Sequence, residues 1–374
     1  FIYSITPIVY NIGIIIGALF FTPTMGIKGL AYGVILGALL HLAVQIPDLI
    51  RHGFKYEFIF DFKNNYVKKI GKLMIPRALG LATTQLNLLV ITGLASTVGG
   101  GSIGIFNFAN NIQQFPIGII GISFAIAAFP ALSQFVAEGK TNQLSELLSQ
   151  AIRQILFFMI PLTIIFLLLR AQIVRVILGS GAFNWSDTIN TANTLAFFAL
   201  SFFAQALAPL LMRAFFALHD TWTPFIISVI SAIINIFLGI YLKNILGVSG
   251  LALAFSISMV IQLSLLWLFL RKKINNLQEN KLLQSLNKIS FAALIMAIFI
   301  QFIKTPLANL VDMTRLWGIF TQGAAAGIFG LIIYIVICYL LKLEEIIQLR
   351  ASLERRFLKL KNVQSGELTE ADEI

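Results

Sequence analysis

Charged side chains are scarce in this sequence: Asp, Glu, Lys and Arg make up only 11% of its 374 residues. Soluble domains carry about 25% charged residues, so these charges are too few to solvate a globule of this size. The single cysteine, Cys338, lies in an apolar run and excludes a disulfide framework or a Cys-based zinc site. The three histidines are far apart in the sequence, so no metal centre and no cofactor is expected. What remains is a polytopic membrane protein, consistent with a hydrophobic content of 58%.

Long apolar runs separated by Gly, Pro and charged breaks determine the fold class. A membrane-crossing helix needs about 20 mostly apolar residues. Strands of a membrane barrel would alternate polar and apolar residues, whereas these runs are apolar on all faces. We therefore expect an all-α polytopic membrane helical bundle with about ten transmembrane helices. The ten predicted spans are 2–21, 29–50, 74–97, 104–134, 152–170, 190–212, 224–242, 249–270, 288–304 and 316–341.

The net charge of +11 is interpreted as topology rather than as nucleic-acid binding. Cytoplasmic loops of membrane proteins are enriched in Lys and Arg. Most of the 27 basic residues fall in one set of alternating loops and in the C-terminal tail, which places both ends of this fragment in the cytoplasm. The opposite loops hold only Lys28, Arg170, Arg175, Lys243, Lys304 and Arg315.

Acidic side chains are missing from the interiors of the predicted spans, because all sixteen Asp and Glu residues fall in loops, in the tail or at helix ends. An ionisable group inside the membrane usually marks a transport pathway. Without a carboxylate there, this part of the molecule has no obvious group to relay a proton or to hold a sodium ion. The sequence therefore disfavours ion coupling through these helices.

Two similar turns predict an internal repeat. The sequence Gly26-Ile27-Lys28-Gly29-Leu30-Ala31 opens the second span, and Gly247-Val248-Ser249-Gly250-Leu251-Ala252 opens the eighth. Six spans separate the two copies, an even number, which predicts two parallel six-helix lobes related by an axis along the membrane normal. On this interpretation the chain, which begins with Phe1, lacks the first four helices of the first lobe.

The repeat divides the chain into six predicted segments. They are the last two helices of the N-terminal lobe (1–51), a cytoplasmic linker (52–73), a complete C-terminal six-helix lobe (74–271), a second cytoplasmic linker (272–287), two extra helices (288–341) and a cytoplasmic tail (342–374).

The fourth predicted span is unusually polar. Asn107, Asn110, Asn111 and Gln114 are spaced i, i+3, i+4, i+7, which places four amides on one stripe of a helix. They either hold neighbouring helices together or form the wall of a polar substrate cavity. Pro116 removes a backbone donor and predicts a kink, and Gly118 continues the region without a side chain. We take the stripe as a candidate cavity wall and the kink as a candidate gate.

The third predicted span also carries polar side chains. Arg77 lies about one turn from the cytoplasmic end, where its guanidinium either reaches the headgroups or faces the cavity and binds a phosphate. Gln85 and Asn87 follow on the same helix and are candidate cavity residues. Four single amides elsewhere are interpreted as helix packing contacts. They are Gln205, Asn235, Gln262 and Gln322.

A short segment between the sixth and seventh spans reads RAFFALHDTWTP, from Arg213 to Pro224. Thr223 is expected to cap the next helix, and Pro224 suits its first turn. Arg213 and Asp220 are seven residues apart, about two turns, so they could share one cytoplasmic surface. The segment, with Thr221, is either a tight elbow between helices or a hinge and inner gate.

These residues resemble the MurJ/MviN family of lipid II flippases, in the multidrug/oligosaccharidyl-lipid/polysaccharide exporter superfamily. The resemblance covers essentially the whole chain and rests mainly on the elbow and on the fourth-span pattern from Phe108-Ala109 to Phe115-Pro116. It also includes Pro7 to Asn11 and the pair Pro76-Arg77. Family members often have charged residues where this chain has Asn110, Asn111 and Gln114, so recognition of charge by this helix is not expected here. The family has fourteen helices, which agrees with a chain that begins at the fifth.

The resemblance implies translocation of lipid II, an undecaprenyl-pyrophosphate-linked disaccharide-pentapeptide, across the bacterial cytoplasmic membrane by alternating access. Such a protein breaks no covalent bond and is not an enzyme. Its partners would be lipid II, membrane lipids and cell-wall synthesis proteins, and not nucleic acid. Three alternatives remain: a flippase for lipid-linked polysaccharide or oligosaccharide, a multidrug antiporter, and a membrane scaffold that recruits cell-wall enzymes through its tail.

Overall fold

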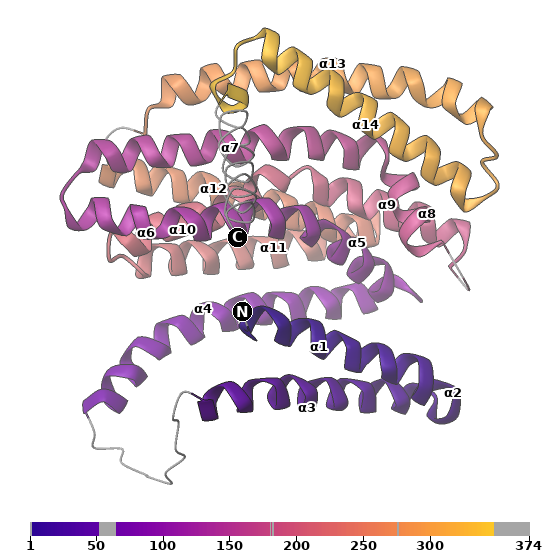
Figure 1. The fold of residues 1–374 in the computed structure, drawn as a ribbon, viewed down its shortest axis with the longest axis horizontal. Coiled ribbons are helices and arrows are strands. Elements are labelled where there is room, and N and C mark those ends of the chain that lie inside the picture. The colour runs from indigo at the N-terminus through magenta and orange to yellow at the C-terminus, as the bar shows by residue number, and fades with distance from the viewer. Residues whose placement is uncertain (1, 52–64, 180, 182, 275–276, 348–374) are drawn as a thin grey trace, which may run out of the picture. The chain divides into compact units, whose positions relative to one another are not determined.

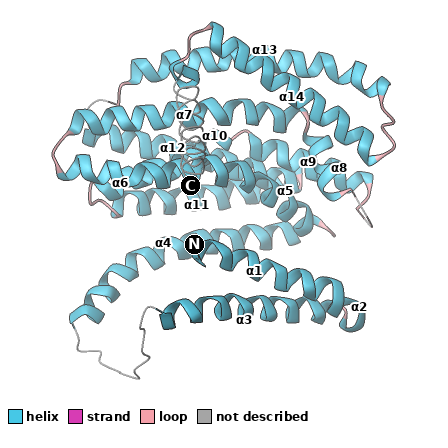
Figure 2. Cartoon of the chain, in the orientation of Figure 1, coloured by secondary structure: helices cyan, strands magenta, loops and turns pink. Residues whose placement is uncertain are grey.

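The structure is a computed structural model that describes residues 2–51, 65–179, 181, 183–274 and 277–347. All of the regular elements in these ranges are helices (Figure 2). Every predicted span falls on one helix or on consecutive helical segments with at most a short break between them. The predicted tail beyond residue 347 and most of the first predicted linker lie outside the described residues. The chain divides into two compact units, residues 1–72 and residues 73–374.

The first unit is a hairpin of helices (Figure 1). Its elements are α1 (Ile2–Ile16), the π-helical turn η1 (Gly17–Phe21), α2 (Thr22–Met25) and α3 (Ile27–Arg51). Close packing between α1 and α3 depends on glycine, because a Cβ on Gly13 would overlap the Cα of Gly37 and one on Gly17 would overlap Gly33. In a membrane the association of helices is driven largely by such close contact. This spacing of small residues therefore holds the hairpin together.

The second unit contains the remaining helices, and α4 (Asn65–Ser96) begins just before the boundary between the units. Its elements are α5 (Ser102–Pro116), η2 (Ile117–Ile122), α6 (Ser123–Ala137), α7 (Thr141–Leu168), α8 (Arg170–Leu178), α9 (Trp185–Ala199), α10 (Phe202–Ala217), α11 (Trp222–Leu246), α12 (Val248–Ile274), α13 (Glu279–Leu310) and α14 (Leu316–Leu340).

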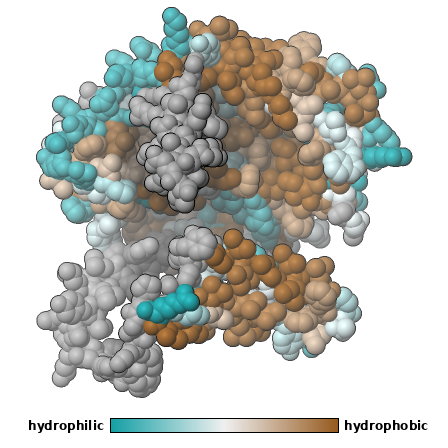
Figure 3. All heavy atoms as spheres, in the orientation of Figure 1, coloured by the Kyte–Doolittle hydropathy of each residue, from teal (hydrophilic) through white to brown (hydrophobic). Residues whose placement is uncertain are grey.

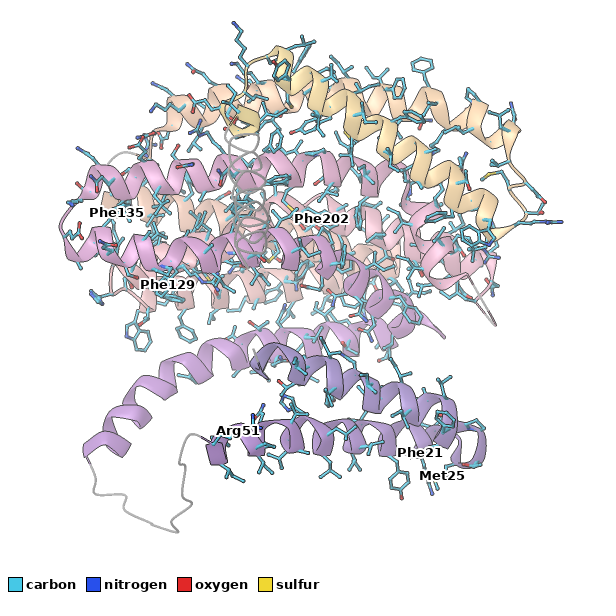
Figure 4. All side chains as sticks on the ribbon, viewed as in Figure 1. Phe21, Met25, Arg51, Phe129, Phe135 and Phe202 are labelled. Atoms are coloured by element: carbon cyan, nitrogen blue, oxygen red, sulfur yellow. The ribbon has the colours of Figure 1, made fainter. Side chains whose placement is uncertain are left out.

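The core of the second unit lies where α10 and α12 meet their neighbours. Helix α12 packs against α9, α10 and α11, while α6, η2 and α7 pack against α10. Phe202 at the start of α10, labelled in Figure 4, is fully buried and makes an edge-to-face contact with Phe166 at 5.1 Å between ring centroids. Helices α13 and α14 cover α7 on the outside of this bundle.

Hydropathy agrees with a membrane protein. Within the searched part of the chain, eight helices are long and apolar enough to cross a membrane, or nine if the bent pair α9–α10 is one span. The remaining predicted span lies in α4, where most side chains before residue 82 are outside the described set. Apolar side chains cover the face of the second unit over α13 and α14, between hydrophilic ends (Figure 3).

The sixth predicted span is broken rather than continuous. Helices α9 and α10 meet at an angle of 46° at Leu200 and Ser201. The Ser201 hydroxyl donates to the Phe198 carbonyl at 3.0 Å, and the Ser256 hydroxyl of α12 donates to the Phe197 carbonyl at 2.6 Å. Serine hydroxyls can replace the backbone bonds of a helix in this way. The break is therefore made by side chains and not by proline.

Candidate functional site

The stripe of amides predicted on the fourth span lies on α5, and the helix exposes it unevenly. Asn111 and Gln114 are exposed, whereas Asn107 and Asn110 are half-buried. Asn110 accepts a hydrogen bond from Gln113 at 2.9 Å. No hydrogen bond to another described residue involves the side chain of Asn107, Asn111 or Gln114. Most of the stripe therefore does not hold the helices of the second unit together.

The amide that does hold helices together is Gln113, which the sequence analysis did not single out. It is fully buried, and its Oε1 accepts from Nε2 of Gln205 on α10 at 3.0 Å. Gln205 also donates to Ser201 at 2.9 Å, and the hydroxyls of Ser201 and Ser256 are 2.9 Å apart. A buried polar chain thus runs from α5 through α10 to α12, at the break between α9 and α10. Gln205, predicted to be a packing contact, is a central member.

The other three single amides also make the packing contacts predicted for them. Asn235 donates to Asn87 of α4 at 3.1 Å, which joins α11 to α4. Gln262 donates to Ser228 at 3.1 Å, and Gln322 donates to the Lys304 carbonyl at 2.9 Å. Asn87, a candidate cavity residue, therefore has a structural partner as well.

The other polar residues of α4 differ in how far the structure describes them. Gln85 is exposed and Asn87 is half-buried. Arg77 lies on α4, but its side chain is outside the described residues. The predicted phosphate contact of Arg77 therefore stays a prediction.

The kink expected at Pro116 takes the form of a π-helical turn. Pro116 ends α5, and η2 follows immediately from Ile117 to Ile122. Proline cannot donate to the carbonyl of Ile112, and π-helical turns are among the usual sources of helix kinks. Gly121 in this turn packs so closely on Ala206 of α10 that a Cβ there would overlap the Ala206 backbone, while Gly118 faces open space.

The elbow between α10 and α11 is held by Asp220. Its carboxylate accepts from the backbone N–H of Thr223 at 3.0 Å and from the Thr223 hydroxyl at 2.6 Å, and it forms an ion pair with Lys273 of α12 at 2.5 Å. Burial alone would raise the pKa of Asp220, but the bonds from Lys273 and Thr223 lower it from 3.8 to about 2. The pair fastens the elbow to the end of α12.

Two expectations for the elbow are modified by the structure. The prediction that Thr223 caps α11 is wrong, because α11 begins at Trp222 and the Thr223 hydroxyl donates to Asp220 instead of accepting from the helix. Thr221 occupies the N-cap position without a side-chain bond. Pro224 lies in the first turn, as predicted, and is buried. Among the described side chains, Asp220 pairs with Lys273 rather than with Arg213, which is half-buried.

Comparison with known proteins shows which family has this helical architecture. A family model described as "Lipid II flippase MurJ" matches residues 1–321. The chain is 30% identical over 266 residues to the probable lipid II flippase MurJ of Vibrio cholerae, covering 71% of this chain and 51% of that protein. It is 28% identical over 346 residues to that of Thermotoga maritima, covering 92% of this chain and 66% of that protein.

A solved structure has the same fold. It is titled "Lipid II flippase MurJ, inward closed conformation" and matches with a TM-score of 0.72 at 26% identity, covering 90% of this chain and 67% of that one. The helical fold and its long apolar helices define a multi-pass helical membrane protein. With residues 1–321 matched by the family model, the chain belongs to the lipid II flippase MurJ family. It spans about half the length of several curated relatives that it matches.

Proposed function

We propose that the full-length protein moves lipid II across the bacterial cytoplasmic membrane. The observation that carries this proposal is the match of residues 1–321 to the lipid II flippase MurJ family, which the shared fold supports. The protein is then a transporter that breaks no covalent bond, and not an enzyme. Its partners are lipid II, the surrounding membrane lipids and, in the cell, proteins of cell-wall synthesis.

The polar stripe of α5 supplies part of the wall along which the cargo headgroup moves. Three of its four amides have no partner among the described side chains, so they are available to sugar hydroxyls or peptide groups of a cargo. Gln85 on α4 is exposed as well, and Asn87 and Arg77 lie on the same helix. We assign the pyrophosphate contact to Arg77, because a guanidinium binds phosphate oxygens bidentately.

The elbow serves as the inner gate. Asp220 holds the start of α11 to the end of α12 through Lys273, so the two helices form a unit that turns together. Arg213, Thr221 and Pro224 lie in or beside the same turn. The change from α- to π-helix between Pro116, the last residue of α5, and Gly118 in η2 provides a second flexible point.

The two units belong to two six-helix lobes that open alternately to either side of the membrane. The turn at Gly247 in the second unit repeats the turn at Gly26 in the first, which supports equivalent places in two related lobes. The distribution of basic residues places both ends of this chain in the cytoplasm. Because the interiors of the predicted spans of this chain lack acidic residues, the membrane potential acting on the charged cargo complex is the favoured driving force.

The test uses a bacterium whose own lipid II flippase can be depleted. The full-length protein should restore growth and return lipid II to the outer leaflet, measured with an externally added enzyme that cleaves only outward-facing lipid II. The stripe variants Asn111→Leu and Gln114→Leu are tested beside the unmodified protein, with Phe115→Leu, next to the stripe, as their matched control. Continued accumulation of inward-facing lipid II with a folded, membrane-inserted protein would overturn the proposal.

A further inference from the structure

A small pocket in the second unit lies where the chain bends between α7 and α8. The bend is at Leu169, and the pocket is lined by the end of α7, the first turn of α8, one face of α9 and Lys304 of α13. Its volume is about 190 Å³. Sites for drug-sized ligands are roughly 300–1,000 Å³. The pocket therefore suits a single small group rather than the headgroup of a large glycolipid.

The lining of this pocket contains two cations and no acid. Arg170 and Lys304 both line it, together with the amides of Gln172 and Asn193. Among the described residues, no ion pair involves either cation. Two positive charges that share one pocket repel each other, and an anion between them would remove that repulsion.

Hydrogen bonds to the end of α7 use only some of the N–H donors of Arg170 and Lys304. Arg170 donates through Nη1 to the Leu167 carbonyl at 2.9 Å, and Lys304 donates to the Leu168 carbonyl at 3.0 Å. Cations are favourable at the end of a helix such as α7. However, a guanidinium has five N–H donors and an ammonium has three. Each cation therefore keeps donors that the helix end does not use.

The middle of α7 holds a basic residue whose charge is balanced from within the chain. Arg153 is nearly buried and forms ion pairs with Glu344 at 2.6 Å and with Glu345 at 3.4 Å. The charge there is balanced from within the chain. At the α7–α8 bend two cations share one pocket whose lining contains no acid, so an anion from outside would complement both of them.

Hydrogen bonds behind the pocket fix its shape. Gln172 of α8 donates to Gln322 of α14 at 3.1 Å, and Gln322 donates to the Lys304 carbonyl at 2.9 Å. These bonds tie α8, α13 and α14 together and hold the backbone of Lys304 in place. The side chain of Asn193, which lines the pocket, has no hydrogen bond with a described residue, so its amide is free to donate. The pocket is thus built before any ligand arrives.

We infer that this pocket binds a phosphate-type oxyanion through Arg170 and Lys304, with Asn193 as a further donor. The oxyanion is either the phosphodiester of an anionic lipid headgroup or free phosphate. This inference is independent of the transported cargo.

Binding to the purified full-length protein in detergent tests the inference. Inorganic phosphate, phosphatidylglycerol and a diacylglycerol of the same chain length are titrated while binding and thermal stability are measured. The double variant Arg170→Gln/Lys304→Gln should weaken binding about tenfold or more, since charge-assisted bonds are the strong ones. The control Arg175→Gln changes a basic residue of α8 that lies outside the pocket lining and bonds the Phe183 carbonyl. It should bind as the unmodified protein does.

The outcomes separate the two sources of the oxyanion. Binding of both phosphate and phosphatidylglycerol supports a site for any phosphate-type oxyanion, and binding of phosphatidylglycerol alone supports a lipid headgroup site. Equal binding of diacylglycerol, no binding of either phosphate compound, or unchanged binding by the double variant overturns the inference. If the double variant does not fold, the single variant Arg170→Gln, at an exposed position, decides in the same way. Lipid II transport is not measured, so the result does not depend on the proposed function.

Discussion

Gly26 and Gly247 share one backbone conformation, with φ of 60° and 61° and ψ of −140° and −137°. Each accepts a bond from the glycine three residues later, Gly29 at 2.9 Å and Gly250 at 3.1 Å. A side chain is excluded at those later glycines, because a Cβ would overlap the Phe21 backbone or the Leu242 carbonyl. The short sequence similarity therefore encodes the same turn twice, once in each unit.

Changing Gly247 to Ala should destabilise the protein by about 1–3 kcal/mol, because an L-residue is strained at this φ and ψ. Thermal unfolding of the full-length protein in detergent measures the loss. The control is Gly100→Ala, in a turn where φ is not positive and an added Cβ meets nothing within 4 Å. An equal loss of stability in both variants would show that the backbone conformation of Gly247 does not account for the loss.

The buried bond between Gln113 and Gln205 should be energetically coupled. Changing Gln205 to Leu leaves the Gln113 oxygen buried without its donor, which costs about 1–3 kcal/mol. Changing both residues to Leu removes both polar groups and should cost less than the sum of the single changes. A double-mutant cycle on thermal stability measures the coupling. Purely additive effects would contradict the bond.

The ion pair of Asp220 predicts a pH dependence. Its pKa is lower in the folded protein than its ordinary value of 3.8, so the carboxylate stabilises the fold above pH 4 and loses that effect as the pH falls toward 2. The effect is on the order of 2 kcal/mol. Unfolding measured between pH 6 and pH 2 should show it.

The matched variants for this pH dependence are Lys273→Gln and Lys272→Gln. Lys273 makes the ion pair, while the neighbouring Lys272 lies over the Phe269 ring instead. The first variant should lose a large part of the pH dependence between 4 and 2, and the second should keep it. The same behaviour in both would mean that Lys273 does not hold the pKa of Asp220 down.

The stripe of α5 should matter for transport more than for stability. Asn111→Leu and Gln114→Leu replace exposed amides that have no described partner, so thermal stability should change by less than about 0.5 kcal/mol. Transport of lipid II should fall about fivefold for each, the equivalent of one net hydrogen bond of about 1 kcal/mol. The control Phe115→Leu should retain transport. A large loss of stability without a specific loss of transport would favour a packing role.

Much of the fold could be predicted from the sequence because insertion into lipid depends on apolar length, which a sequence shows directly. The positions of the helices followed from that property. The break at Ser201 could not be predicted, since the Ser256 hydroxyl that satisfies the Phe197 carbonyl comes from a helix more than fifty residues away. The close packing of α1 and α3 could have been predicted from the regular spacing of their glycines, which are Gly13 and Gly17 on one side and Gly29, Gly33 and Gly37 on the other.

The candidate site could be predicted only in part. Helical spacing correctly grouped the amides of α5, but it did not indicate that Gln113, one position away from Gln114, faces α10 and is buried. Which side of a helix meets a neighbour depends on tertiary packing, and the spacing of polar residues does not contain that information. Likewise, the charges at Arg170 and Lys304 were interpreted only as topology, because residues more than 130 positions apart gave no sign of sharing a pocket.

The π-helical turn η2 has a consequence for insertions and deletions. Each residue of an α-helix turns the chain by about 100°, and a π-helical turn contains an extra residue relative to an α-helix. The π-helical turn thus spreads about the same rotation over one more residue, so removing one residue between Ile117 and Ile122 would let the chain continue as an α-helix while α6 keeps about its present facing. Ala125, Ala128 and Leu132 would then stay buried in the core. In an α-helical segment, by contrast, a one-residue deletion turns the following residues by about 100° about the axis, so η2 is a place in this span where the chain tolerates the loss of one residue.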